Sequence, residues 1–397
     1  MKLAALADAL VARARRGIRI EVDPALARPA LWVALRLSLA LLFGVARVGD
    51  SSAQPSAADT AKKLIEFGWD EPDPRFMREH IAQLLRTPFD GCVFHLTFRN
   101  PSGRDDNFAW RVWSRGAFPD SAVQRGLDDL RATRFGRFRY NFLRINVTPA
   151  NFDWFDDHGA VLHNVNLAAR VARAAGCPGL LFDTEPYQKP LWWYEKQRDT
   201  TAHGWDGYAA QAHRRGREVI EAMQAGYPDL TVILTFGYSM SWEKRPGGLG
   251  ALRQSEYGLL APFLDGMFAG ARGRTTIVDG YEQSYGYRDT TKFARAYRRV
   301  RFELLPIVAD TAAYARHLSV GFGLWMDLDW KRFGWDTLAT DRNFFTPAAF
   351  ERAECAALRT ADRYVWVYTE APRWWSEAGK PVQLPAAYDS AVRHPRR

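Results

Sequence analysis

The chain alternates eight times between a short apolar segment and a longer amphipathic one, and this alternation restricts its fold more than any other feature. In the longer segments apolar residues recur at helical spacing, and residues 208–226 end on Gly226, the residue type expected after a helix. The short segments have the length and composition of buried strands, at residues 63–69, 91–98, 141–148, 179–185, 231–238, 275–282, 320–327 and 363–370. Eight such alternations within about 310 residues predict an α/β fold, a (β/α)8 TIM barrel.

A doubly wound open sheet is the alternative α/β fold. Such a sheet usually carries a glycine-rich phosphate-binding turn after its first strand, whereas residues 67–74 read FGWDEPDP. No repeat and no long Pro/Gly-rich linker interrupts the chain after residue 60. We therefore assign residues 54–397 to a single barrel domain.

The first 53 residues have the pattern of a bacterial signal or targeting segment. An apolar stretch at residues 37–46 follows Arg36, and Ser51 and Ala53 suit the small-residue positions of a cleavage site. The stretch is too short to span a bilayer as a helix. The sequence therefore predicts an exported protein, periplasmic or secreted, with no stable membrane anchor after the signal is cleaved.

Charge and cysteine content indicate which partners to expect. The formal net charge is +9, but the arginines are interspersed with acidic residues and no basic run stands beside a nucleic-acid motif. We expect no nucleic-acid partner. Cys92, Cys177 and Cys355 form no CxxC pair, which argues against a disulfide framework and a zinc cluster, and we expect no cofactor or metal.

Polar side chains gather in the last third of the predicted strands. In a barrel, alternate strand residues face the lumen, and the carboxyl ends of the strands build the active site. Five pairs of polar or aromatic residues share one parity each: His95 and Thr97, Arg144 and Asn146, Asp183 and Glu185, Trp325 and Asp327, and Tyr368 and Glu370. This agreement predicts a polar pocket at the top of the lumen.

Tryptophans follow the predicted strands, in the loops that would surround this pocket. They are Trp69, Trp192, Trp193, Trp242, Trp330, Trp374 and Trp375. Indole rings gathered on one face suit the flat C–H faces of pyranose sugars, although each ring taken alone is more typical of a packed core. A carbohydrate substrate is therefore expected, with candidate binding residues Trp69, His95, Arg144, Asn146, Tyr187, Trp192, Trp193, Tyr238, Trp242, Tyr281, Trp325, Tyr368 and Trp374.

Carboxylates at the strand ends suit glycoside hydrolysis, which needs one protonated and one ionised carboxyl group. Glu185 is the candidate general acid, because repulsion from Asp183 would raise its pKa. The candidates for its partner are Glu282, Glu370 and Asp327.

Two motifs resemble those of known glycoside hydrolases. Glu185-Pro186 is similar to the Asn-Glu-Pro of clan A, and Asp183-Thr184-Glu185 resembles the end of the chitinase signature DxxDxDxE. Both resemblances imply that Glu185 is the acid/base. The chain departs from the first motif at Thr184, and from the second at the two earlier aspartates, where it has other residues.

Two other classes of protein remain open from the sequence. A metal-dependent barrel hydrolase would need several histidines at the ends of its strands as metal ligands, and His95 is the one histidine at a predicted strand end. A non-catalytic carbohydrate-binding barrel would keep the tryptophans without needing the carboxylates. The sugar, the linkage, exo or endo action and the oligomeric state also stay open.

Overall fold

The computed structural model describes residues 61–243, 249–375 and 384–396, and the predicted signal at residues 1–53 lies outside them. The chain divides into two compact units, Met1–Asp59 and Thr60–Arg397, and the description that follows concerns the second. In its described part, no helix is both long and apolar enough to cross a membrane.

This unit is built on one parallel sheet that closes into a barrel. The strand order is β10-β11-β1-β2-β5-β6-β7-β8-β9, and neighbouring strands run parallel throughout. Gly321 alone separates β9 from β10, so the chain itself joins the two ends of the sheet. The strands are β1 (Lys63–Gly68), β2 (Gly91–Phe94), β5 (Phe142–Asn146), β6 (Gly179–Asp183), β7 (Thr231–Leu234), β8 (Thr276–Asp279), β9 (Leu318–Val320), β10 (Phe322–Trp325) and β11 (Tyr364–Thr369).

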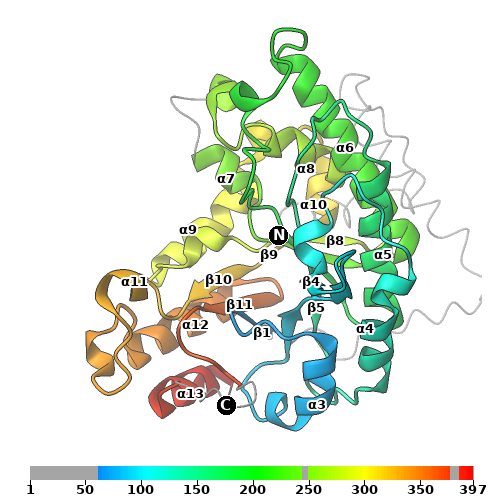
Figure 1. The fold of residues 1–397 in the computed structure, drawn as a ribbon. Helices are drawn as coiled ribbons and strands as arrows, with labels where there is room; N and C mark the ends of the chain where they lie inside the picture. Colours follow the sequence, from blue (N-terminus) through cyan, green and yellow to red (C-terminus); the bar gives the residue numbers. More distant parts are fainter. Residues whose placement is uncertain (1–60, 244–248, 376–383, 397) are drawn as a thin grey trace, which may run out of the picture. The chain divides into compact units, whose positions relative to one another are not determined.

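With β9 and β10 counted as one interrupted strand, the barrel has the eight strands that the sequence predicts, and the (β/α)8 fold is confirmed. The first and last strands, β1 and β11, lie side by side although most of the chain separates them (Figure 1). The paired strands are shorter than predicted at their carboxyl ends. Glu185, Glu282 and Glu370 therefore stand just beyond the sheet, where loops carry them.

Helices fill the connections between the strands. The longer ones are α3 (Pro74–Leu84), α4 (Ser121–Ala132), α5 (Gly159–Ala174), α6 (Trp205–Gly226), α8 (Leu260–Gly270), α9 (Thr291–Arg298), α10 (Thr311–His317), α12 (Pro347–Thr360) and α13 (Ala386–Arg393). Short helices and turns are η1 (Phe108–Arg111), η2 (Tyr194–Lys196), α7 (Tyr238–Glu243), η3 (Leu249–Gln254), η4 (Glu282–Ser284), η5 (Arg299–Glu303), η6 (Leu305–Ile307), α11 (Trp330–Phe333), η7 (Thr340–Arg342) and η8 (His394–Arg396).

Local sequence signals fix where the barrel helices begin. Asp73 caps α3 by accepting a hydrogen bond from the backbone N–H of Phe76 at 2.8 Å, and Pro74 takes the first helical position. Thr346 caps α12 in the same way. Because α3 starts directly after β1, its cap also fixes the loop that carries Trp69 and Glu71.

The lumen of the barrel is apolar in its lower part and polar at its carboxyl end. Its apolar layer consists of Ile65, Phe67, Val93, Phe142, Leu181, Ile233, Val278, Tyr364 and Trp366. Side chains two positions apart in a strand share a face, so the next lumen-facing residue after each of three apolar residues is polar. Arg144 comes after Phe142, Asp183 after Leu181 and Tyr368 after Trp366. The predicted change from apolar to polar lumen thus occurs within single strands.

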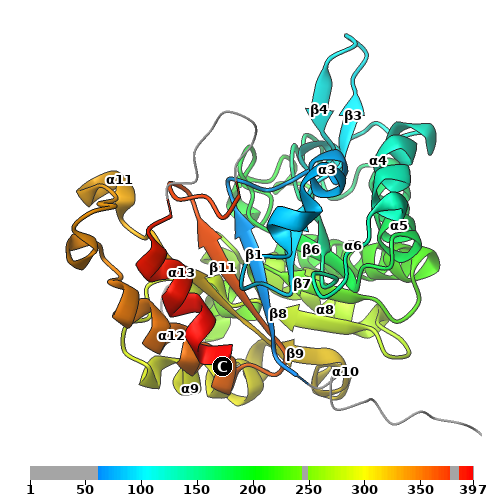
Figure 2. The same cartoon turned by 90° about the horizontal axis from the view of Figure 1, so that it is seen from below.

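One connection departs from the regular alternation. After β2 the chain leaves the barrel and forms an antiparallel hairpin of β3 (Thr97–Arg99) and β4 (Asp105–Asn107), which projects away from the barrel strands (Figure 2). Thr97, predicted to face the lumen, instead bonds from its hydroxyl to Asp73 at 3.2 Å. The hairpin returns through η1, which brings Asn107 and Trp110 back to the top of the barrel.

Candidate active site

A cavity of about 610 Å³ opens at the carboxyl end of the barrel, and every barrel strand or its following loop contributes to its wall. We call it the active cavity. It is lined by Phe67, Gly68, Trp69, Glu71, His95, Asn107, Trp110, Arg144, Asp183, Glu185, Tyr187, Thr235, Glu282, Tyr285, Trp325, Lys331, Tyr368 and Glu370. Ten of these were candidates from the sequence: Trp69, His95, Arg144, Asp183, Glu185, Tyr187, Glu282, Trp325, Tyr368 and Glu370.

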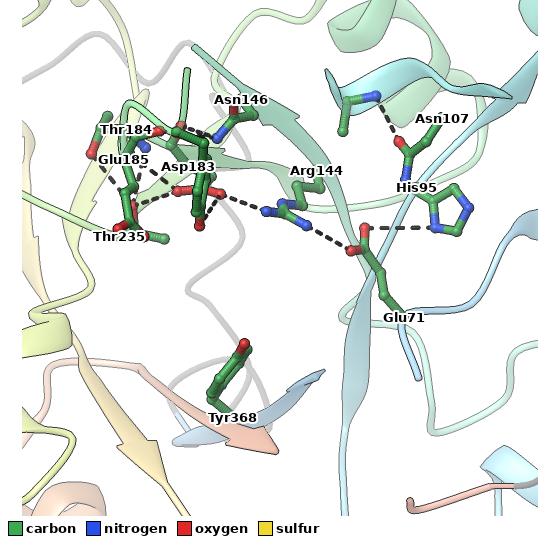
Figure 3. A network of polar contacts seen from close by, with 12 residues as sticks. Glu71, His95, Asn107, Arg144, Asn146, Asp183, Thr184, Glu185, Thr235 and Tyr368 are labelled. Carbon is green, nitrogen blue, oxygen red and sulfur yellow. Dashed lines mark hydrogen bonds and ion pairs between the residues drawn. The ribbon is translucent and has the colours of Figure 1, made fainter. Parts of the chain in front are cut away.

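Arg144 is the fixed cation of the cavity. Its Nη2 lies 2.6 Å from Asp183 Oδ2 and its Nη1 lies 3.0 Å from Glu71 Oε2 (Figure 3). Burial alone would lower the pKa of Arg144, but the two carboxylates raise it. The guanidinium also stands 4.8 Å from the centre of the Trp110 ring. Arg144 therefore stays charged and has little freedom to move.

Asp183 is held by donors from several directions. Besides Arg144, it accepts hydrogen bonds from the Thr235 hydroxyl at 3.2 Å, the backbone N–H of Glu185 at 3.2 Å and the Tyr187 hydroxyl at 3.3 Å. These contacts occupy both carboxylate oxygens (Figure 3). Asp183 thus fixes the loop on which Glu185 stands, and a reacting group would have to compete with four donors to reach it.

Asn146 supports the same loop from behind the cavity wall. Its side-chain amide donates to the backbone carbonyl groups of Asp183 at 3.2 Å and of Glu185 at 3.3 Å (Figure 3). It is fully buried and does not line the cavity. The structure thus gives this sequence candidate a positioning contact in place of a contact with a bound sugar.

Glu185 projects from the loop after β6 into the cavity. Burial raises its pKa, and the negative charge of Asp183 raises it further, as the sequence reasoning expected. The Tyr187 hydroxyl and the Arg144 guanidinium act in the opposite direction, because both favour the ionised form. Glu185 therefore has both a cause for a raised pKa and partners that stabilise its anion.

Glu282 enters the cavity from the loop after β8. Tyr281 just before it has a left-handed backbone with φ of 42°, an uncommon conformation for a residue of this type and one that concentrates at functional sites. Burial raises the pKa of Glu282 well above its ordinary value, and the charges of Glu185 and Asp183 add to this effect. Among the described residues, the Glu282 carboxylate has neither a hydrogen bond nor an ion pair.

Glu370 lines the cavity in a different electrostatic state. Lys331 Nζ lies 2.9 Å from its carboxylate, the Trp330 indole N–H donates to it at 2.7 Å, and the Tyr368 hydroxyl lies at 3.3 Å. Its charge is therefore neutralised by a lysine and its oxygens are occupied. The ion pair leaves Glu370 less available for proton transfer than Glu282.

Asp327 is buried beside the cavity but does not line it. Its carboxylate accepts hydrogen bonds from the backbone N–H groups of Glu370 at 3.1 Å and Ala371 at 2.7 Å, and from the Trp325 indole at 2.9 Å. Parity places it with Trp325, but the strand ends there and the chain turns. Asp327 caps the loop after β11, and this contact differs from the catalytic role considered for it from the sequence.

Six aromatic candidates from the sequence lie outside the active cavity. Trp192 is buried and donates its indole N–H to the carbonyl of Thr184 at 2.7 Å. Tyr238 is buried and bonds to Asp265 at 2.7 Å. The remaining four are Tyr281 and Trp374, both buried, and Trp193 and Trp242, both partly exposed. Loop tryptophans near a strand end can pack beneath the loop as well as above it, and the sequence pattern does not distinguish the two.

Eight lining residues had no signal strong enough for the sequence to mark them as site residues: Phe67, Gly68, Glu71, Asn107, Trp110, Thr235, Tyr285 and Lys331. Glu71 follows the first strand in the segment FGWDEPDP, which has neither a glycine-rich turn nor strand periodicity. Trp110 and Asn107 reach the cavity through the hairpin excursion, which has no barrel periodicity. Tyr285 lies three residues past the selected Glu282 and stacks on Tyr368 with ring centres 5.6 Å apart.

Within the described ranges, no three His, Cys, Asp or Glu side chains are grouped so that they could hold a metal ion.

The fold and the cavity define a class: a TIM barrel with an acidic, aromatic-lined pocket at the carboxyl ends of its strands. No protein-family model matches the sequence, and no curated protein matches it significantly.

Solved structures that resemble this chain are TIM-barrel glycoside hydrolases of families 5 and 18 at low sequence identity. A broad-specificity family 5 endoglucanase from an uncultured bacterium is 13% identical, with a TM-score of 0.46 over 82% of this chain and 85% of that one. A family 5 enzyme from Prevotella bryantii, solved with a xyloglucan tetradecasaccharide, is 10% identical, with a TM-score of 0.46 over 84% and 96%. A family 18 chitinase from Flavobacterium johnsoniae is 7% identical, with a TM-score of 0.30 over 84% and 94%.

Proposed function

We propose that this chain is a glycoside hydrolase that cleaves a poly- or oligosaccharide, with Glu185 and Glu282 as its two catalytic carboxyl groups. One observation carries the proposal. These two carboxyl groups line one cavity and their charges interact, and within the described ranges neither forms an ion pair, whereas Asp183 and Glu370 both do. A pair of carboxyl groups that share a site and hold one proton between them is the equipment that glycoside hydrolysis requires.

The surroundings of the two groups support a division of roles. Glu282 is the more deeply buried, and no described residue donates a hydrogen bond to its carboxylate, so we assign the proton of the pair to Glu282, the general acid. Arg144 favours the ionised form of both groups, but the Tyr187 hydroxyl favours that of Glu185 alone, which suits Glu185 to act as nucleophile or general base. This assignment reverses the sequence-based prediction, which gave the proton to Glu185.

The remaining charged residues serve to position the pair. Asp183 holds the Glu185 loop through a backbone N–H, and Arg144 holds Asp183. Lys331 forms an ion pair with Glu370, and a carboxylate in the cavity wall is suited to accept hydrogen bonds from sugar hydroxyl groups. Trp69, Trp110 and Trp325 supply apolar surface for the faces of the rings.

A leaving-group experiment tests the proposal. Wild type, Glu282→Gln and Glu185→Gln are assayed on oligosaccharides and on dinitrophenyl glycosides, whose leaving group departs without a proton. Glu282→Gln should lose about 10²-fold or more on oligosaccharides but keep most of its rate on the activated substrates. Glu185→Gln should lose both activities. If the wild type hydrolyses neither class across a panel of α- and β-linked sugars, the proposal is wrong.

A carbohydrate-binding barrel without activity is the second candidate, because the aromatic wall alone would bind sugars. The two candidates differ in what Glu282→Gln does. A binding protein has no hydrolytic activity for this isosteric change to abolish. Its effect would then be detected only as a change in ligand affinity, measured by titrating ligand into the variant.

We also propose that the protein acts outside the cytoplasm, on the strength of the signal-like segment at residues 1–53. N-terminal sequencing of exported material should find the mature terminus within a few residues of Ala53. An intact chain recovered from the cytoplasmic fraction alone would contradict this.

A further inference from the structure

The active cavity is negatively charged although the chain as a whole is strongly basic. The formal net charge of the chain is +9. In the cavity, five carboxylates (Glu71, Asp183, Glu185, Glu282 and Glu370) face two permanent cations, Arg144 and Lys331. Both cations already form ion pairs: Arg144 pairs with two carboxylates and Lys331 with one. Among the described residues of this wall, an anionic sugar would therefore find no arginine or lysine that is not already in an ion pair.

A second cavity of about 310 Å³ continues this acidic surface. It shares Glu71 and His95 with the active cavity and adds Asp70, Asp73 and Glu79. Its one lysine or arginine, Arg75, is paired with Glu79 at 2.9 Å. The walls of the two cavities together hold eight carboxylates and three permanent cations. We call this pair of cavities the acidic cleft.

Glu71, which lines both cavities, has one carboxylate oxygen without a hydrogen-bond donor among the described residues. Its side chain is only 9% exposed, and Oε2 binds Arg144, but Oε1 has no hydrogen-bond partner among the described residues. His95 Nδ1 lies 3.8 Å from this oxygen, beyond hydrogen-bond distance, and is also without a hydrogen bond among the described residues. A buried carboxylate oxygen left without a donor is costly, which points to a donor that arrives with the ligand.

We infer that the substrate is a glycan that carries free amino groups, bound along the acidic cleft in its ammonium form with one ammonium donating to Glu71. This inference rests on the proposed glycosidase function and names its substrate class. An ammonium group supplies three donors and one positive charge, which matches both the unused oxygen and the excess of carboxylates. A uronic or sulfated glycan would add negative charge to a cleft in which the described residues offer no free cation to receive it, so we expect such a glycan to bind poorly.

The test compares oligosaccharides that differ in one substituent. Each set has the same linkage and length, in α and β forms: hexosamine with a free amine, the N-acetylated hexosamine, the neutral hexose and the hexuronic acid. Binding is followed by the fluorescence of the tryptophans that line the cavity, and hydrolysis by release of reducing ends, both at pH 6. The free amine should bind about tenfold more tightly than the neutral sugar, and the hexuronic acid should not bind measurably.

Salt and substitution identify the source of the preference. Raising the salt from 0.05 to 0.5 M should weaken binding of the amine about threefold or more and leave the neutral sugar nearly unchanged. Glu71→Gln should remove most of the preference, whereas Glu303→Gln, which deletes one charge at an exposed position outside the cleft, should retain it. If Glu71→Gln does not fold, the salt dependence of amine binding by the wild type tests the inference alone, and binding that does not weaken with salt would contradict it.

The outcomes separate the two proposals. Tight, salt-sensitive binding of the amine without hydrolysis of any substrate would support the substrate class and overturn the glycosidase function. Hydrolysis of neutral or N-acetylated sugars with equal or better affinity than the free amine would overturn the substrate class and leave the glycosidase function standing.

Discussion

Glu185 and Glu282 enter one cavity from the fourth and sixth strands of the barrel, and the charge of Glu185 is, after burial, the largest cause of the raised pKa of Glu282. Charge repulsion between two sites is reciprocal, so each group makes ionisation of the other harder. We therefore expect the pair to titrate as a unit and to keep one proton over a pH range in which isolated glutamates would both be ionised.

The pH dependence of the reaction follows from this coupling. Activity should rise as Glu185 ionises and fall as Glu282 loses its proton, and both limbs should lie above the ordinary pKa of glutamate because both values are raised. In Glu185→Gln the repulsion disappears and the pKa of Glu282 should fall. Carbon-13 NMR titration of the carboxyl groups in wild type and variant measures this. A Glu282 pKa that stays unchanged in the variant would refute the coupling.

A second buried carboxylate makes stability depend on pH. Glu66 on β1 is completely buried on the face away from the lumen, and burial, with Asp70 as the next cause, raises its pKa well above the ordinary value. The folded state then binds the proton more tightly than the unfolded state does. This contribution to stability is fully present below the unfolded pKa and is lost as pH rises through the folded pKa.

Glu66→Gln should therefore stabilise the protein increasingly as pH rises, because it keeps the shape and removes the buried charge. Thermal unfolding from pH 4 to pH 8 should give a melting temperature for the variant that overtakes that of wild type with rising pH. Glu303→Gln, exposed on the surface, is the matched control and should follow wild type. Parallel curves for Glu66→Gln and wild type would contradict this account.

The barrel could be predicted from the sequence because each strand is buried on both faces and reads as an apolar run. Parity then placed Arg144, Asp183 and Tyr368 in the lumen wall. The ends of the strands could not be predicted, because hydrophobicity does not indicate where backbone pairing stops. Asp327 follows the parity of Trp325, yet it lies past the last paired residue and caps a loop.

Loop residues were the least predictable part of the site, because their burial is decided by contacts far away in the sequence. Trp69 and Trp192 both follow a strand and both are indoles, yet one is 54% exposed at the cavity and the other is fully buried. Glu71 gave no signal because its partner Arg144 lies 73 positions away, on a strand whose neighbourhood only the closed barrel defines.

Removing the central cation should unfold or strongly destabilise the barrel. Arg144→Met would leave the carboxylates of Glu71 and Asp183 buried without their cation, and breaking a buried ion pair in this way costs about 3–5 kcal/mol. Urea unfolding measures the change. Arg170→Met, which breaks the exposed pair with Asp120, is the control and should unfold close to wild type. An equal loss of unfolding free energy in both variants would show that the buried Arg144 ion pairs stabilise the fold no more than an exposed pair does.

Trp192 offers a test of the packing beneath the Glu185 loop. Trp192→Phe removes the indole N–H that bonds to the buried carbonyl of Thr184, and an unpaired buried carbonyl costs about 1–3 kcal/mol. We expect a lower melting temperature and, since Thr184 precedes Glu185, a lower kcat. A variant that keeps wild-type stability but loses affinity for sugar would instead place Trp192 in contact with the ligand.

Trp69 should show the opposite behaviour. Its ring is 54% exposed at the cavity mouth, lies edge-on to Trp330 at 6.1 Å and carries the Lys331 ammonium at 5.1 Å. Because little of it is buried, Trp69→Ala should change the free energy of unfolding by no more than about 0.5 kcal/mol.

Loss of an apolar platform for a sugar ring should raise the Kd for oligosaccharides about tenfold, while Trp69→Tyr, which keeps a flat ring, should retain most of the affinity. The rate on a small aryl glycoside should stay near wild type, since Trp69 stands at the mouth and the Glu185–Glu282 pair is unaltered. Calorimetric titration with oligosaccharide, beside thermal unfolding of the same samples, measures both effects. If Trp69→Ala binds as tightly as wild type, the aromatic mouth does not bind sugar and the expected path of the glycan over Trp69 is wrong.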